Sequence, residues 1–149
     1  MKILLVGSIL IQFLIVPAFG NDDPKYVIGQ ILKALPLGSH SGHTSTGSAC
    51  NVSAMIFHLG QMNVFRVNMD ISDSSTNEGV RFQTQHGDSL SNFKEGKDAL
   101  SVVFGNMMNG VPCLACDSLL QIRKNAEGFA NAVYIRGSKA DTGVVCILR

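Results

Sequence analysis

Hydrophobic positions recur with two different periods along this chain of 149 residues. The acidic pair at 22–23 and Pro24 form a helix-start signal. Apolar residues then return every three or four positions, at Val27, Ile28, Ile31, Leu32 and Leu35. Pro36 and Gly38 end the stripe. The spacing predicts an amphipathic helix whose apolar side packs against the rest of the domain.

A period of two replaces the helical period after residue 49. Cys50–Leu59 is mostly apolar, and in 63–71 every second residue is apolar. We therefore expect two strands joined at Gly60-Gln61, with a common face formed by Phe65, Val67, Met69 and Ile71. Further strands are expected at 80–85, 129–136 and 143–148.

Two other segments have weaker patterns. Residues 39–48 are rich in Gly, Ser, Thr and His, which predicts a loop. Residues 118–123 fit either a strand or a helical turn.

A second amphipathic helix is expected between Asp98 and Gly110. Its apolar stripe is formed by Leu100, Val103, Phe104, Met107 and Met108. With helices and antiparallel strands segregated in this way, the predicted fold class is α+β. Two amphipathic helices would pack on one face of an antiparallel β-sheet.

The first twenty residues resemble an export signal. Lys2 precedes an apolar run from Ile3 to Val16, Pro17 breaks the run, and Ala18-Phe19-Gly20 offers a cleavage site with small residues. The alternative is an uncleaved membrane anchor, but the run is short for a bilayer span. We expect a signal peptide at 1–20 and a single secreted domain at 21–149, without a membrane span.

The charge balance argues against nucleic acid as a partner. Lys and Arg number 12 and Asp and Glu number 11, so that without Lys2 the domain is formally neutral. We expect a monomer that binds an extracellular or cell-surface target.

Secretion changes how the cysteines are interpreted, because an oxidising compartment favours disulfides. Cys50, Cys113, Cys116 and Cys146 allow three pairings. Cys113 with Cys116 would form a small redox-type ring. The alternative joins Cys50 and Cys146 separately to Cys113 and Cys116, which would brace the fold. A zinc site built from the four thiolates is a third interpretation.

Few residues suggest a reaction. His58 and His86 provide an alternative acid–base pair of a secreted ribonuclease, with Glu78, Arg66 and Arg81 on adjacent strands. Asn51-Val52-Ser53 is a glycosylation sequon. No catalytic residue, metal or cofactor is expected. A carrier of apolar ligands would need an empty cavity between the helices and the sheet.

The C-terminal half resembles a known toxin family. The segments Asn109-Gly110, Cys113-Leu-Ala-Cys116-Asp-Ser118 and Gly128-Phe-Ala-Asn-Ala-Val-Tyr134-Ile135 carry the likeness, and Ala49-Cys50 with Phe57 matches an earlier segment. They are similar to the virus-encoded fungal killer toxins of the calcium-channel-blocking corn-smut type. The resemblance implies a disulfide-braced α/β sandwich and an activity directed at other cells.

The sequence therefore predicts a small secreted protein that acts as a toxin or effector through its binding surface and not as an enzyme. The alternative is a small secreted hydrolase, a ribonuclease in particular.

Overall fold

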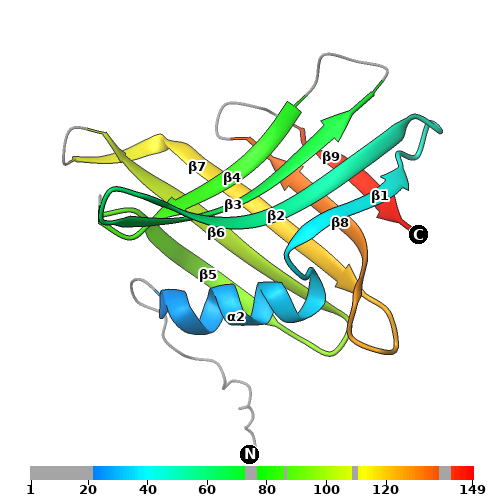
Figure 1. Cartoon of the computed structure of the whole chain (residues 1–149), viewed down its shortest axis with the longest axis horizontal. Helices are drawn as coiled ribbons and strands as arrows, with labels where there is room; N and C mark the ends of the chain where they lie inside the picture. The colour runs from blue at the N-terminus through cyan, green and yellow to red at the C-terminus, as the bar shows by residue number, and fades with distance from the viewer. Residues whose placement is uncertain (1–21, 73–76, 86, 109–110, 138–141) are drawn as a thin grey trace, which may run out of the picture.

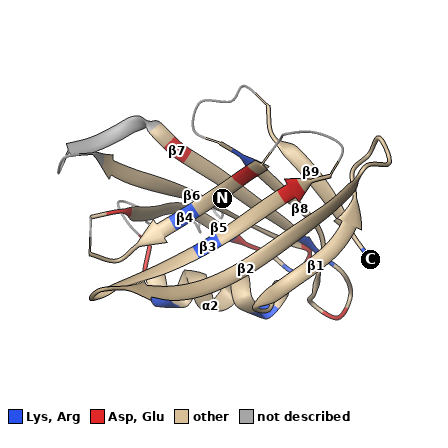
Figure 2. Cartoon of the chain, turned by 45° about the horizontal axis from the view of Figure 1, so that its top comes forward, with Lys and Arg blue, Asp and Glu red and all other residues tan. Residues whose placement is uncertain are grey.

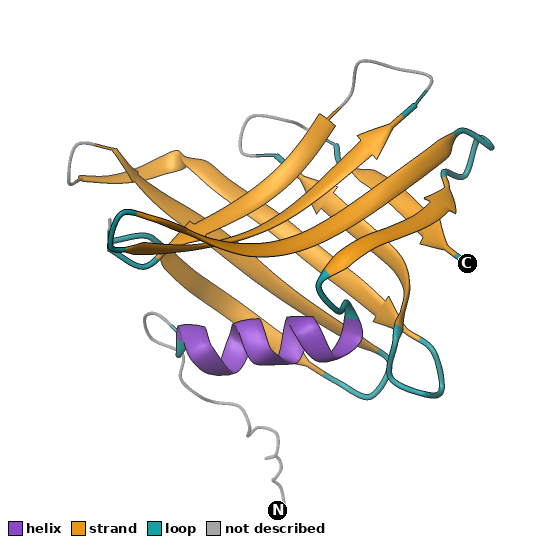
Figure 3. Cartoon of the chain, in the orientation of Figure 1, coloured by secondary structure: helices purple, strands orange, loops and turns teal. Residues whose placement is uncertain are grey.

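Nine strands and one helix make up the part of the chain that the structure describes (Figures 1 and 3). This computed structural model describes residues 22–72, 77–85, 87–108, 111–137 and 142–149, without the side chains of 108 and 111–115. The expected leader, residues 1–20, lies outside the described residues. The elements are α2 (Pro24–Ala34), β1 (Gly38–His43), β2 (Ala49–Leu59), β3 (Met62–Ile71), β4 (Asn77–Gln83), β5 (Ser89–Glu95), β6 (Ala99–Met108), β7 (Val111–Lys124), β8 (Ala130–Arg136) and β9 (Val144–Leu148).

All of these strands belong to one antiparallel sheet, in the order β4-β3-β2-β1-β9-β8-β7-β6-β5. Strands β1–β4 form one meander and β5–β9 a second, and the two meet where β1 pairs with β9. The sheet curls until β4 approaches β6, β7 and β8, so that it is nearly closed and barrel-like (Figure 1). The predicted α+β class, with two helices packed on a sheet, is therefore wrong.

The second predicted helix is in fact strand β6. Leu100, Val102 and Phe104 point into the barrel and are buried, while the residues between them lie on the outer face. The apolar residues at 100, 103, 104, 107 and 108 have helical spacing only because both faces of this strand carry apolar side chains. A strand that is apolar on both faces produces positions that also satisfy the helical period.

The tertiary structure also supplies strands that the pattern did not predict. The expected loop at 39–48 contains β1, which pairs with β2 along its whole length. The ambiguous segment 118–123 lies within β7, which pairs with both β6 and β8. Strands with a weak local pattern form because their neighbours supply backbone hydrogen bonds, and local sequence carries little of that information.

Alternating side chains from the two meanders fill the inside of the barrel. The predicted hairpin at Gly60-Gln61 is confirmed, and Phe65, Val67 and Met69 are buried as expected. The rings of Phe65 and Phe104 stack across the interior, with centroids 6.4 Å apart. Other buried contributors include Val52, Val80, Leu90, Leu120, Ile122, Val133 and Ile135.

Helix α2 confirms the first predicted helix and covers one end of the barrel beside β5 (Figure 1). Asp23 caps it, since its carboxylate accepts a hydrogen bond from the Lys25 amide at 3.2 Å. Val27, Ile31 and Ala34 are buried in the common core. Within the described residues, no helix has the length and apolar character needed to cross a bilayer.

A disulfide holds the junction between the meanders. Cys50 on β2 is bonded to Cys146 on β9, and the two Cα atoms are 6.0 Å apart, next to the end of β1. Gly42 of β1 lies opposite Cys50 of β2 on one side and opposite Leu148 of β9 on the other. A side chain there would collide with the carbonyl oxygen of Ile147, so the close approach of β1 to β9 requires glycine.

The disulfide joins residues separated by 96 positions, so its loss should strongly destabilise the fold. For the Cys50→Ala/Cys146→Ala variant we expect the free energy of unfolding to fall by about 4–5 kcal/mol, the loop-entropy value for a loop of this size. Urea denaturation measures the difference. Ser45→Ala in an exposed turn is the control, with an expected change within about 0.5 kcal/mol. An equal change in both variants would contradict the role given to the disulfide.

Candidate functional site

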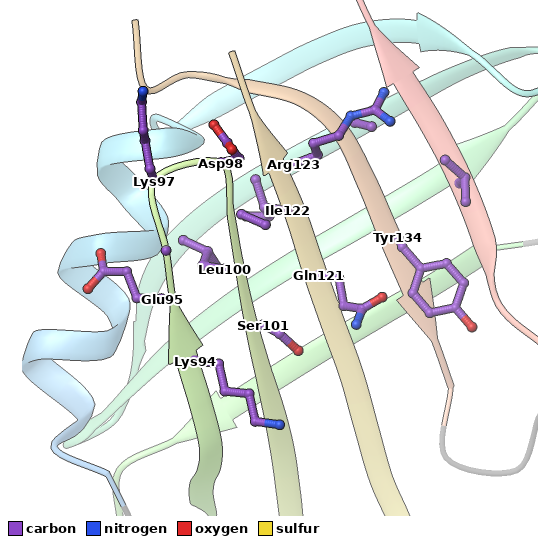
Figure 4. Close-up of a pocket in the computed structure, with 14 residues that line it drawn as sticks. Lys94, Glu95, Lys97, Asp98, Leu100, Ser101, Gln121, Ile122, Arg123 and Tyr134 are labelled. Carbon is purple, nitrogen blue, oxygen red and sulfur yellow. The ribbon is translucent and has the colours of Figure 1, made fainter. Parts of the chain in front are cut away.

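A groove runs over the outer face of the second meander. It encloses about 660 Å³, and residues of all five strands β5–β9 line it. The sheet register places Lys94, Ser101, Gln121, Tyr134 and Val145 in one row, each opposite the next on the neighbouring strand. Figure 4 shows the first four of these side chains following one another across the sheet.

Short side chains create the hollow. In the adjacent row, Ala99 and Ala132 lie on either side of Arg123. These two methyl groups and the small Ser101 leave space between the longer side chains of Gln121, Arg123 and Tyr134. The buried Leu100 and Ile122 alternate with them and belong to the core beneath. The groove therefore rests on a packed interior.

The position of the Tyr134 ring is restricted by Gly143. A Cβ atom at Gly143 would lie 2.6 Å from Cζ of Tyr134, so the ring lies flat against this glycine. Gly143 directly precedes β9, and an aromatic ring that covers a glycine at the edge of a neighbouring strand is a known way to fix both in place. Tyr134 thus presents a half-exposed aromatic face beside the amide of Gln121.

The charges of the groove are mixed, with more cations than anions. Lys94, Lys97 and Arg123 line it together with Glu95 and Asp98. Arg123 donates from Nε to Oδ1 of Asn131 at 3.0 Å. Neither lysine ammonium group has a hydrogen bond or an ion pair within the described residues. The site offers hydrogen-bond donors, an amide, a hydroxyl and an aromatic face, which suit a polar ligand with some negative charge.

Glu95 connects the groove to helix α2. Its carboxylate accepts hydrogen bonds from the Tyr26 hydroxyl at 2.8 Å and from the side-chain amide of Gln30. Tyr26 also contacts Phe93 edge-to-face, with ring centroids 6.0 Å apart. The hydrogen bond to Glu95 raises the pKa of Tyr26 above its ordinary value, with smaller contributions from burial and from the charge of Glu95.

The expected acid–base pair of histidines is not seen in the part of the chain that the structure describes. His58 is exposed near the end of β2, opposite Asn63 of β3, and its imidazole makes no hydrogen bond with any described residue. His86 lies outside the described residues. Arg66 and Arg81 do face each other across β3 and β4, but Glu78 lies opposite Met69, three pairs farther along the strands.

The disulfide between Cys50 and Cys146 has a structural role. Because Cys50 is bonded to Cys146, the pairing of each with one cysteine of the CxxC segment is wrong. A zinc site made from all four thiolates is excluded for the same reason. Cys116 is disulfide-bonded and the side chain of Cys113 is not described. The CxxC segment lies in β7 and not at a helix N-terminus, where low thiol pKa values arise.

The sequon asparagine points outward from β2. Asn51 is half-buried, and its side-chain nitrogen donates to Oγ of Ser53 at 3.3 Å on the same face. Cys50 points to the opposite, inner face, so the disulfide does not crowd the sequon. Asn51 does not line the groove.

The groove residues were not predicted from the sequence. Ser101 lay in a predicted helix and Gln121 in the ambiguous segment, so no strand register related them to Tyr134. A strand assignment at 99–108 would have revealed the alternation of Ser101 with buried neighbours.

Comparisons with known proteins place the chain in no family: no family model, no curated protein and no solved structure matches it.

The Tyr26–Glu95 contact predicts a loss of helix docking at high pH. Because the fold raises the pKa of Tyr26 above its ordinary 10.0, the contact stabilises fully below about pH 10 and is lost as pH rises through the folded pKa. The Tyr26→Phe variant should thus denature more easily than the parent protein at pH 8 and approach it at pH 11. Thermal denaturation at the two pH values measures this. A difference that is constant or grows with pH would contradict the assignment.

Proposed function

We propose that the mature protein is secreted and acts on other cells as a toxin or effector, by binding through the outer face of its second meander. The groove over β5–β9 is the binding site. The observation that carries the proposal is the row of hydrogen-bonding side chains across the four neighbouring strands β5–β8, with the ring of Tyr134 held against Gly143.

A rigid sheet supports this proposal better than a flexible loop would. Ser101, Gln121 and Tyr134 alternate with buried neighbours, and their strands β6, β7 and β8 are each paired on both sides. Preorganised side chains lose little conformational entropy when a partner binds. Tyrosine and arginine are also the residue types that most often dominate binding energies at protein interfaces.

From the resemblance to killer toxins, the proposal takes only the idea that the protein acts on other cells. The α/β sandwich that it implies is not the fold found, since the segments from 99 to 136 are strands of the barrel-like sheet. The proposal therefore rests on the groove and on the expected leader.

Binding to susceptible cells tests the proposal. Labelled mature protein would be incubated with fungal and host cells, and bound label, growth and ion flux measured. We expect saturable binding that weakens roughly tenfold or more in Tyr134→Ala, since truncating a central aromatic anchor commonly costs about 2 kcal/mol. Lys94→Gln should weaken it less.

Lys33→Gln is the matched control, because Lys33 is an exposed lysine on α2, outside the groove. It should bind like the parent protein. No saturable binding and no effect on any cell would refute the proposal. Equal binding by the Tyr134→Ala variant would refute the assignment of the groove.

A further inference from the structure

The hairpin of β2 and β3 carries an apolar outer surface that the groove does not include. We define the hairpin patch as Met55, Phe57 and Leu59 of β2 with Met62 and Val64 of β3. The register pairs Phe57 with Val64 and Leu59 with Met62, so the five side chains are neighbours on one face. Leu59 is 49% exposed, whereas Val64 is buried beneath its neighbours. The patch is therefore an apolar surface whose exposure increases toward the end of the hairpin.

The inward-facing side of β2 also carries one exposed apolar side chain near the hairpin end. Ile56 alternates with the buried Val52 and Ala54, but it lies beyond them along β2 and is 44% exposed. The neighbouring His58, Gln61 and Asn63 are polar, and no carboxylate occurs between residues 55 and 65. Leu59 and Met62 at the end of the outer face, with no carboxylate near them, suit insertion into an apolar medium.

Two arginines form a row behind the patch. Arg66 of β3 lies directly opposite Arg81 of β4, and Arg66 is also opposite Met55. Figure 2 shows the two blue bands next to each other on β3 and β4. Neither guanidinium has a hydrogen bond or an ion pair within the described residues. Like charges in a directly opposite pair destabilise a sheet, so this row has a cost that binding of an anion would offset.

The carboxylates on and next to β3 and β4 lie away from the hairpin patch or are already hydrogen-bonded. Asp70 and Glu78 lie at the far end of β3 and β4 from the hairpin turn. Asp88, which follows β4, is already engaged, because its carboxylate accepts from the backbone amides of Gln83 and Met107 at 3.1 and 3.3 Å. The exposed charge next to the patch is therefore positive.

We infer that this hairpin docks on a bilayer that contains anionic phospholipids. Leu59 and Met62 lie four residue pairs beyond the arginine row, about 13 Å along the strands. Interfacial segments bury their apolar face about 5–10 Å below the headgroups. With the hairpin end inserted to that depth, the two guanidinium groups reach the level of the phosphates. The inference depends on the exposed hairpin alone and does not require the proposed groove function.

Vesicle co-sedimentation tests the inference with the mature protein. One set of vesicles is phosphatidylcholine alone, and in the other phosphatidylserine replaces part of it. We expect binding only where phosphatidylserine is present, weakening as salt is added. For the Arg66→Gln/Arg81→Gln variant we expect binding to fall about 25-fold, from roughly fivefold for each arginine near an anionic surface.

Matched controls separate the hairpin from general charge and hydrophobicity. Lys33→Gln/Arg136→Gln removes two exposed cations elsewhere and should bind like the parent protein. Leu59→Asn should lose binding, whereas Leu37→Asn, at a leucine that is 57% exposed, should not. Far-ultraviolet circular dichroism confirms that each variant is folded.

Other occupants of the patch would give different results, and each would overturn the inference. Equal binding to both kinds of vesicle would show that the arginines do not select the surface. Binding of polyglutamate without vesicle binding would assign the patch to an acidic protein. A dimer in analytical ultracentrifugation that Leu59→Asn dissociates would assign it to a second copy of this chain.

Discussion

The junction of β1 with β9 is the constraint on which the rest of this structure depends. Only Gly42 with Leu148 and His43 with Ile147 are paired there, yet these pairs join the two meanders into one sheet. The disulfide between Cys50 and Cys146 joins β2 directly to β9 beside this junction. Without this short junction, each meander would expose its inner apolar face to water, at a cost that a two-residue pairing alone would not offset.

The sheet is joined at β1 and β9 but not at its two end strands, β4 and β5. Polar contacts cover the edges of these two strands. β4 and β5 are the ends of the strand order, although they are consecutive in sequence. Asp88 between them bonds to the backbone of both β4 and β6, and Asp22 bonds to the free edge of β5 at Leu90 and Phe93. These contacts satisfy backbone groups that an exposed sheet edge would leave without partners.

The two walls of the closed sheet present different outer surfaces. The second meander carries the polar groove, where short side chains leave a hollow between Gln121, Arg123 and Tyr134. The first meander carries the hairpin patch and the paired arginines. Because a barrel-like sheet turns its alternate residues outward on all sides, each wall can carry its own binding chemistry over one shared core.

Local sequence determined those elements whose stabilising contacts are close in the chain. The helix at 24–34 followed from its cap, its proline and its apolar stripe, and the β2–β3 hairpin followed from alternation around Gly60. The tertiary structure alone decided that 99–108 is a strand, that the polar segment at 38–43 pairs with β2 and β9, and that Cys50 meets Cys146. It also assembled the groove from residues 94 to 145, since cross-strand register depends on pairings between distant segments that no local period encodes.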